Sequence, residues 1–401
     1  MEINPSSIVD ILTLRYDSSI TPSLPKKTSK DFVPHDKPIN LSFFENLICD
    51  EIEKKIKFFN DKEVSIALSG GVDSALVLSL LRKVRPEMKI HAVSIKFANS
   101  VDETPAASKI AEKFDAQHHI IELENYLSEL PKAISIIKKP FWDLHWYYVV
   151  KKSQTLSKTL ISGDGGDELF GGYTFRYQKF LSLTSDNSTA IEKVKAYLNC
   201  HERDRVSDQE NIFNKQSNFS WNYIHDRLLP FFENDLPRIN QVYLADYNGK
   251  LLYNFNPINS RIIEYFKMNL LTPLLNDQFL SITSHIPTKY KYDEQNNIGK
   301  LPLRALLEQK NLTSLISKDK LGFNVNTQNL WKNHGHALCK EFLDNPRIVE
   351  EGWINNDWIK KHIDNPELDI KYVNKFLGLL AFEIWYRLFI TKEINENTKL
   401  V

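Results

Sequence analysis

The sequence predicts an α/β protein in which a doubly wound parallel sheet is followed by a mainly helical C-terminal half. Between residues 63 and 161, short apolar stretches alternate with amphipathic ones, a pattern typical of parallel strands joined by helical crossovers. Beyond about residue 185 the strand signal fades and helical patterns dominate. We therefore expect an irregular N-terminal segment over 1–40, an α/β domain over 41–185 and a mainly helical region over 186–401 that completes the site.

Each element follows from local patterning. Prolines and lysines in residues 1–40 argue against a long helix there, whereas residues 41–59 have the apolar spacing of an amphipathic helix. We expect strands at 64–68, 90–97, 119–123 and 159–161, and helices at 73–85, 104–114, 125–137, 144–155 and 371–390.

Composition excludes several classes of protein. The 401 residues carry 51 Lys and Arg against 51 Asp and Glu, and this zero net charge argues against general nucleic-acid binding. We expect no membrane span, because no apolar run reaches the required length, and the N-terminus lacks the pattern of a secretory signal. Cys49, Cys200 and Cys339 are too far apart to suggest a disulfide framework or a zinc site. We expect a cytoplasmic protein.

Glycine is scarce and clustered. Of 13 glycines, seven lie in two short stretches, 70–71 and 163–172, and each stretch follows a predicted strand. In the first, Ser-Gly-Gly-Val-Asp-Ser at 69–74 opens a predicted helix, so backbone N–H groups and hydroxyls are available to an anion such as phosphate. Asp73 is placed to hold the Mg²⁺ that accompanies a nucleotide. A tight turn capped by Asp73 is the alternative interpretation.

The spacing of this hexapeptide matches neither GxxxxGK[ST] nor GxGxxG. It resembles the pyrophosphate-binding loop of the N-type ATP pyrophosphatases (the PP-loop superfamily), which split ATP between the α- and β-phosphates. The second stretch, Ser-Gly-Asp-Gly-Gly-Asp-Glu-Leu-Phe-Gly-Gly-Tyr at 162–173, resembles the second signature of the asparagine synthetase C-terminal domain. Segments 102–119, 299–304, 318–323 and 379–389 resemble that domain in order and spacing, so the resemblance covers about residues 41–390.

The resemblance implies an adenine-nucleotide α-hydrolase-like fold. It also implies an ATP- and Mg²⁺-dependent carboxylate–amine ligase that forms an acyl-adenylate and releases AMP and pyrophosphate. Asp73 and Asp167 would share Mg²⁺, Lys320 would balance charge on the α-phosphate, and Asp164 would position the acyl substrate or accept the amine's proton. The residues implied for ATP and pyrophosphate are Leu68, Ser69, Gly70, Gly71, Asp73, Ser74, Val93, Ser162 and Gly163.

For some of these residues, a purely structural role is an alternative to a role in the site. Asp167 and Glu168 also suit a helix cap, and Lys320 also suits a solvated surface position. The pair His118–His119 is interpreted as structural, since it lacks further metal ligands nearby.

The sequence departs from the family pattern in two places. A glutaminase cysteine would follow Met1, but position 2 is Glu2 and 68 residues precede the loop, so we expect nitrogen to come from ammonia, an amine substrate or a separate glutaminase subunit. An acidic pair expected before Pro140 is Lys138–Lys139. The family's late Glu-x-Arg aligns with Asn-Leu-Leu at 269–271, and its Asp-Arg with Ser-Arg at 260–261.

These changes suggest that adenylation is retained while the acyl substrate is altered. Relatives form β-lactams, macrocyclic peptides or sugar amides by the same activation. We weigh three alternatives: aspartate as the substrate, another carboxylate with a dedicated amine, and a non-catalytic scaffold of the same fold. A tRNA-modifying ligase is disfavoured by the neutral charge and the absence of catalytic cysteines.

Overall fold

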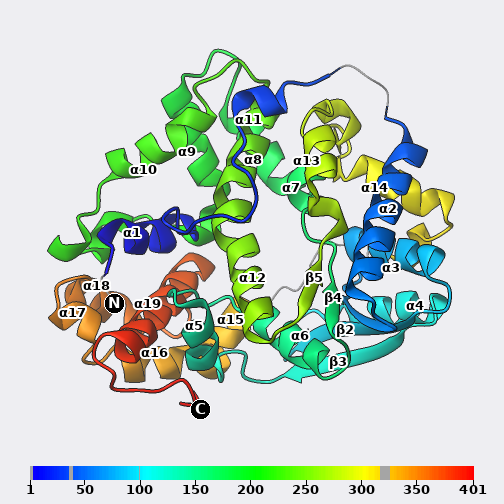
Figure 1. Ribbon diagram of the computed structural model, residues 1–401. Helices are drawn as coiled ribbons and strands as arrows, with labels where there is room; N and C mark the ends of the chain where they lie inside the picture. Colours follow the sequence, from blue (N-terminus) through cyan, green and yellow to red (C-terminus); the bar gives the residue numbers. More distant parts are fainter. Residues whose placement is uncertain (1–2, 36–38, 99, 317–325) are drawn as a thin grey trace.

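A five-stranded parallel sheet forms the centre of one half of the molecule in the computed structural model, which describes residues 3–35, 39–98, 100–316 and 326–401. The strand order is β3-β2-β1-β4-β5. The strands are β1 (Glu63–Ala67), β2 (Lys89–Phe97), β3 (Gln117–Leu123), β4 (Thr159–Ile161) and β5 (Asn269–Leu271) (Figure 1). Helices cover both faces of this sheet, so the predicted doubly wound α/β fold is confirmed.

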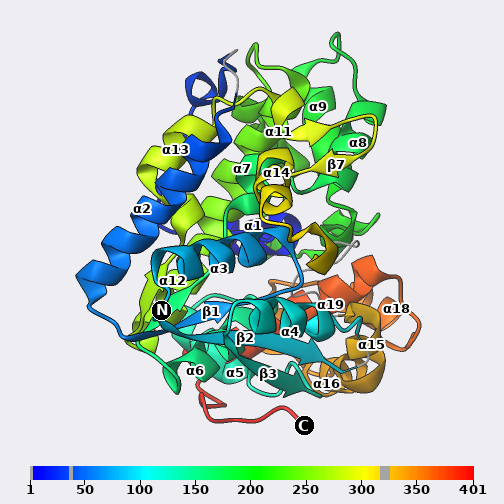
Figure 2. The ribbon, with the colours of Figure 1, turned by 90° about the vertical axis from the view of Figure 1, so that its right-hand side faces the viewer.

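Apolar runs explain why the central strands form. Val64, Ile66 and Ile161 are completely buried, as strands with helices on both faces must be. Helices α3 (Val72–Val84) and α4 (Thr104–Lys113) lie on one face, and α5 (Leu130–Ile137) and α6 (His145–Gln154) lie on the other (Figure 2). Helix α2 (Leu41–Phe59) packs outside α3.

The register brings the two glycine stretches to one edge. β1 pairs with β2 on one side, with Ala67 opposite Val93, and with β4 on the other, with Ile66 opposite Ile161. Parallel strands all end at the same edge of a sheet, so the loops that follow β1 and β4 leave the sheet side by side.

Most predicted elements lie within two residues of the observed ones. The helix expected at 125–137 is the exception, because it begins only at Leu130. β5 was not anticipated: it comes from the region expected to be helical, yet it pairs with β4, with Asn269 opposite Thr159. β4 is equally short, but it leads into the glycine-rich stretch 162–173, whereas no such motif follows β5.

The expectation of an irregular N-terminal segment is wrong for residues 5–14. Pro5–Leu14 form helix α1, in which Pro5 occupies the first turn, where its missing N–H costs nothing, and the side chain of Asn4 caps the helix. Its residues 7–14 are buried, and it contacts α19 (Ile370–Phe389). The helix ends at Leu14, and the left-handed backbone of Arg15 (φ 59°) caps it, well before the next proline, Pro22.

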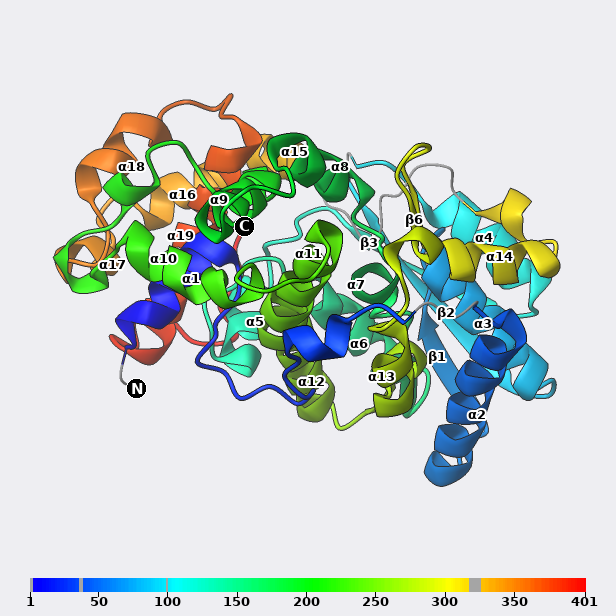
Figure 3. The ribbon, with the colours of Figure 1, turned by 90° about the horizontal axis from the view of Figure 1, so that it is seen from above.

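The rest of the chain is mainly helical, as predicted. Figure 3 shows α16–α19 on one side of the molecule and the sheet with α2–α4 on the other. The remaining α-helices are α7 (Gly166–Phe170), α8 (Thr174–Leu183), α9 (Ala190–Cys200), α10 (Trp221–Leu228), α11 (Arg238–Asp246), α12 (Asn256–Tyr265), α13 (Asp277–Thr283), α14 (Leu301–Gln309), α15 (Thr327–Leu330), α16 (His336–Phe342), α17 (Arg347–Glu350) and α18 (Asn356–Ile363). A hairpin, β6 (Tyr292–Asp293) and β7 (Ile298–Gly299), precedes α14.

Several short 3-10 and π-helical elements connect these helices. A 3-10 turn, η2 (Glu202–Asp204), follows α9, and a π-helix, η6 (Tyr247–Phe255), joins α11 to α12. Within the described residues, no helix has both the length and the apolar character needed to cross a bilayer.

Candidate active site

The two glycine stretches are in direct contact at the carboxyl edge of the sheet. A Cβ atom added to Gly163 would lie 2.9 Å from the backbone carbon of Asp73 and 2.9 Å from the amide nitrogen of Ser74. A Cβ added to Gly166 would lie 2.4 Å from the carboxylate carbon of Asp73. Glycine at these two positions is therefore what allows the second loop to pack on the start of α3.

The first loop is folded by its own hydroxyl groups. The Oγ atoms of Ser69 and Ser74 lie 3.2 Å apart, and the Ser69 Oγ accepts the N–H of Gly71 at 3.2 Å. The N-cap of α3 is Gly71, so no side chain of the capping residue occupies the first N–H groups of the helix. The first turn of this 13-residue helix thus presents backbone donors and a positive dipole end beside the loop.

Leu68 and Val93 form an inner wall of the site. Both are completely buried, and the Leu68 N–H donates to the Val93 carbonyl at 2.9 Å. The Ser94 hydroxyl donates to the Leu68 carbonyl at 2.6 Å and also bonds to His118 Nε2 at 2.8 Å. His118 therefore holds this wall in place through Ser94, which agrees with its predicted structural role.

The second loop places Asp164 between the sheet and the helical half. Its N–H donates to the buried Ser162 hydroxyl at 3.3 Å, and its Oδ2 accepts the side-chain N–H of Asn259 at 3.1 Å. Gly165 next adopts a left-handed conformation (φ 95°) that starts α7, where a Cβ would also collide with Leu275. Asn259 belongs to α12, so the helical half contributes to this loop.

Lys300 joins the two loops electrostatically. Its ammonium lies 2.8 Å from Oδ1 of Asp167 and also pairs with Oδ2 of Asp73. The side chain of Lys300 is 8% exposed. Its left-handed backbone (φ 59°) at the start of α14 and its N–H bond to the Phe170 carbonyl fix the direction of the side chain.

The charges in this cluster shift one another's titration. Burial disfavours the charge of Lys300, but the carboxylates of Asp167 and Asp73 more than offset this and raise its pKa. Burial raises the pKa of Asp164 to about 6, and the nearby charges of Asp73 and Asp167 act in the same direction. Hydrogen bonds from Ser162 and Asn259 partly oppose that rise. Strongly shifted groups that converge beside an anion-binding loop are typical of a functional site.

The structure thus brings together nearly all of the predicted site residues. Ser69–Ser74, the Leu68–Val93 wall, and Ser162, Gly163, Asp164 and Asp167 meet at one edge of the sheet. Lys320 lies outside the described residues. Two contributors were missed, Lys300 and Asn259. The signal for Lys300 was its place in segment 299–304, whereas no motif marked Asn259.

The comparison with known families agrees with this geometry. The sequence model described as asparagine synthase matches residues 53–387. The chain belongs to the asparagine synthase family. The domain that defines this family is ATP-dependent, and the match spans the sheet, both loops and most of the helical half.

Individual relatives are distant. The chain is 34% identical over 149 residues to putative asparagine synthetase [glutamine-hydrolyzing] 2 of Methanocaldococcus jannaschii, a match to 36% of this chain and 28% of that protein. It is 22% identical over 419 residues to asparagine synthetase [glutamine-hydrolyzing] 1 of Bacillus subtilis, covering 95% of this chain and 64% of the relative. The chain therefore spans less than two thirds of the length of either relative.

Among solved structures, an NH3-dependent NAD synthetase from Campylobacter jejuni aligns with 41% of this chain and 76% of its own, at 21% identity. The TM-score of 0.26 is too low to carry an argument.

Contacts within the fold account for one departure from the family pattern. Lys139, which replaces an acidic residue, places its ammonium 2.5 Å from the completely buried carboxylate of Asp17 and 3.4 Å from the Ser7 hydroxyl. Both partners belong to the N-terminal segment. Lys139 therefore serves the docking of α1, and its basic character is explained without reference to any substrate.

Among the other departures, Asn269 also has a partner within the fold. Asn269 donates to the Thr159 hydroxyl at 3.2 Å, at the amino edge of the sheet and away from the loops. At 260–261 the departure is Ser260, whereas Arg261 matches the family pattern and donates to the Ile137 carbonyl, which binds α12 to the end of α5.

Proposed function

We propose that this protein is an ATP-dependent carboxylate–amine ligase of the asparagine synthetase type, which forms an acyl-adenylate and releases AMP and pyrophosphate. The observation that carries the proposal is the convergence of an anion-binding loop with Asp73, Asp164, Asp167 and Lys300 at the carboxyl edge of the sheet. Such a site neutralises a triphosphate at one end and presents a carboxyl group at the other.

The nucleotide is proposed to bind along the two loops. Pyrophosphate would lie on the backbone donors and hydroxyls of Ser69–Ser74, with the ammonium of Lys300 as an additional cation. The adenosine would lie against the inner wall formed by Leu68 and Val93 and against Ser162 and Gly163. Lys320 is retained as the candidate cation for the α-phosphate.

The donor set fits Mg²⁺ that arrives with ATP. Asp73 and Asp167 offer carboxylate oxygens from two loops, and one cation, the Lys300 ammonium, already lies between them. No group of three or more His, Cys, Asp or Glu in the described parts of the chain is arranged to hold a metal by itself. This suits Mg²⁺, which usually takes one or two carboxylates plus substrate phosphates. When bound, it would neutralise phosphate charge.

Asp164 is proposed to act on the amine. With a pKa near 6, its carboxylate is largely ionised at neutral pH and yet basic enough to accept a proton from an attacking ammonium-derived nitrogen. Hydrogen bonds from Asn259 and Ser162 hold this carboxyl group in place, so its direction is fixed before the substrate arrives. Transfer of the proton to Asp164 accompanies formation of the C–N bond and departure of AMP.

The acyl substrate and the nitrogen source are part of the proposal. Aspartate is one candidate, and a different carboxylate is the other. The departures at 138–139 and 269–271 do not decide between them, because Lys139 pairs with Asp17 and Asn269 lies at the amino edge of the sheet. Nitrogen would come from ammonia, an amine substrate or a separate glutaminase subunit. A non-catalytic scaffold of this fold is disfavoured by the intact cluster of acidic residues around Lys300.

The test is pyrophosphate release by the purified protein with ATP, Mg²⁺ and ammonium, and with aspartate or one of a panel of other carboxylates. Release that depends on a carboxylate and on Mg²⁺ supports the ligase, and the active carboxylate identifies the class of substrate. Replacing ammonium by glutamine tests the nitrogen source. Failure to bind ATP at all would leave only the scaffold interpretation.

A further inference from the structure

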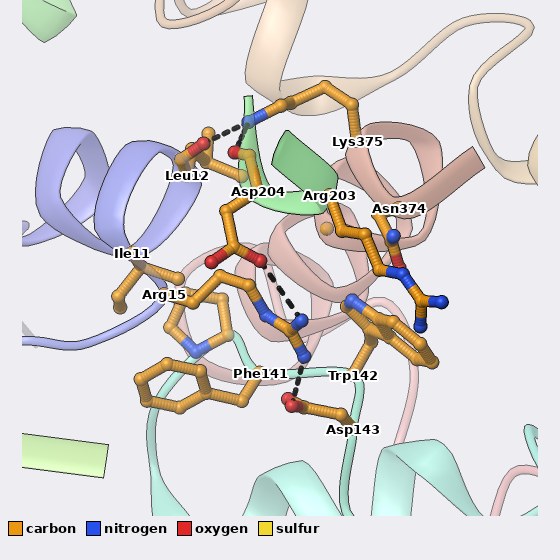
Figure 4. Close-up of a pocket in the computed structure, with 12 residues that line it drawn as sticks. Ile11, Leu12, Arg15, Phe141, Trp142, Asp143, Arg203, Asp204, Asn374 and Lys375 are labelled. Carbon is orange, nitrogen blue, oxygen red and sulfur yellow. Dashed lines mark hydrogen bonds and ion pairs between the residues drawn. The ribbon is translucent and has the colours of Figure 1, made fainter. Parts of the chain in front are cut away.

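A pocket with charged and apolar side chains lies apart from the loops 69–74 and 162–173, between α1, α19, η2 and the segment that joins α5 to α6. Its volume is about 20 Å³, and its lining includes Arg15, Trp142, Arg203, Asn374 and Lys375 (Figure 4). In Figure 4, Arg203, Asn374 and Trp142 gather on one side of the pocket, and Arg15 with its two aspartates on the other. A space of this size admits about one water molecule or one ligand oxygen.

The two carboxylates in this pocket are already matched by cations. Arg15 pairs with Asp143 and, at 3.1 Å, with Asp204. The ammonium of Lys250 lies 2.5 Å from the other oxygen of Asp204. These four side chains therefore balance in charge without a ligand.

Two further cations have no acidic partner. Lys375 is 3% exposed, and its ammonium donates only to the backbone carbonyls of Leu12 and Asp204 in the described part of the chain. Arg203, exposed at the pocket mouth, makes no hydrogen bond or ion pair with any described residue. The pocket thus holds an excess of positive charge within a protein whose net charge is zero. Burial lowers the pKa of Lys375 to about 7, and the charges of Arg15 and Arg205 act in the same direction, while the charge of Asp204 partly opposes them.

Asn374 gives a second, independent indication of a ligand. It is 8% exposed and lines the pocket, yet its amide has no hydrogen-bond partner among the described residues. Its donor and acceptor are therefore available to water or to a ligand that enters the pocket.

The pocket also has an apolar wall, and aromatic rings connect it to the sheet. Ile11, Phe141 and the indole of Trp142 line it. The Trp142 ring lies 6.4 Å from that of Tyr126, which in turn lies 5.6 Å from that of Phe97, the last residue of β2. Two aromatic contacts therefore connect the pocket to the carboxyl end of β2.

We propose that this pocket binds the carboxylate group of a small organic acid or amino acid, held by Arg203 and Asn374 with the ammonium of Lys375 behind them. One oxygen enters the cavity, and the carbon part of the ligand lies at the mouth against Trp142. A planar carboxylate matches the fork of an arginine and the N–H of an amide, and an indole favours carbon over a bare inorganic anion. The pocket gives the proposed ligase a separate place to recognise a substrate.

The test is calorimetric titration with L-aspartate, L-glutamate and glutarate in the absence of ATP, with inorganic phosphate as a further probe. We expect at least one organic acid to bind saturably. Arg203→Gln and Asn374→Asp should each weaken that binding at least tenfold, because one removes a cation and the other places a negative charge beside the ligand. Arg85→Gln, a change to a distant arginine at the end of α3, is the matched control and should bind as the unchanged protein does.

Three results would overturn the proposal: no saturable binding of any of the three acids, equal binding by the Arg203 variant, or phosphate binding at least as tightly as the organic acids. The role of this pocket as a substrate subsite rests on the proposed function, but the binding of an organic acid to the pocket does not. Because ATP is absent from the titration, failure of the ligase proposal would appear separately, as a lack of pyrophosphate release. If the protein is a ligase and the pocket binds its substrate, Arg203→Gln should raise the KM of one substrate and leave kcat within twofold of its value in the unchanged protein.

Discussion

The ammonium of Lys300 lies 2.8 Å from Oδ1 of Asp167, and the same ammonium pairs with Asp73. These residues come from the start of α14, from α7 and from the first turn of α3. A cation held between two carboxylates in this way organises three distant segments around the place where phosphates are proposed to bind.

Replacing Lys300 should strongly impair catalysis. In Lys300→Gln, the proposed site loses a preorganised positive charge, so we expect pyrophosphate release to slow by about 10²–10³-fold. Lys310→Gln is the matched control, since Lys310 ends the same helix and pairs instead with Glu45 at 2.7 Å. If the Lys300 variant keeps full activity, Lys300 has only a structural role.

The contact between the two glycine loops can be tested at Gly163. In Gly163→Ala, the new Cβ would lie 2.9 Å from the backbone of Asp73, and backbone atoms cannot yield as a flexible side chain would. The loops must therefore separate, and we expect ATP binding measured by calorimetry to weaken at least tenfold. Gly335→Ala, whose nearest contact is a Leu377 methyl at 3.2 Å, should bind ATP normally. Unchanged ATP affinity in Gly163→Ala would place the nucleotide elsewhere.

The titration of Asp164 predicts how amide formation depends on pH. Because the raised pKa of about 6 keeps the carboxyl protonated in more acidic solution, kcat/KM should fall as pH drops through about 6. Asn259→Leu removes a bond that stabilises the carboxylate, so the inflection should move to higher pH. Asp164→Asn should abolish the inflection along with most of the activity. An inflection that is identical in the Asn259 variant would assign the titration to another group.

The N-terminal segment should be held to the protein by the pair Lys139–Asp17. The Asp17 carboxylate is completely buried, and although burial raises its pKa, bonds from Lys139, Ser19 and Ser7 more than offset this and lower it. The stability that this group contributes is therefore present at neutral pH and is lost as pH falls through the lowered pKa. We expect a coupling free energy of about 1–3 kcal/mol between the two side chains. It is measured by urea unfolding in a double-mutant cycle of Lys139→Met and Asp17→Asn.

A surface pair provides the control for this cycle. The Lys340 and Asp364 groups lie 2.9 Å apart, but both side chains are more than half exposed, so their coupling should not exceed about 0.5 kcal/mol. Equal coupling in the two cycles would mean that burial of Asp17 adds nothing to the docking of α1.

The sequence was most informative where the structure depends on residues that are close together in the chain. Apolar strands and their crossovers predicted four of the five strands, and the bounds of α2 and β4 agree with those expected. The two glycine stretches indicated the loops that meet, since both follow buried strands of one parallel sheet. Asp73, Asp164 and Asp167 were therefore recognisable as a group before their positions were known.

The features that were missed depend on contacts between distant parts of the chain. Lys300 acquires its role only because the left-handed turn before α14 directs it to loops far back in the sequence. Lys139 looked like a change in the acyl pocket, yet its partner, Asp17, lies in a segment expected to be irregular. Local patterns contain no information on such pairings, which is also why the excess charge around Arg203 and Lys375 was not anticipated.

The most direct test of the proposed ligase follows an oxygen atom. A carboxylate that supports pyrophosphate release is supplied with ¹⁸O in both oxygens, and the released AMP is analysed by mass spectrometry. Attack of the carboxylate on the α-phosphorus predicts AMP that carries one ¹⁸O and an amide that retains the other. Unlabelled AMP, or ADP and phosphate in place of AMP and pyrophosphate, would contradict the account.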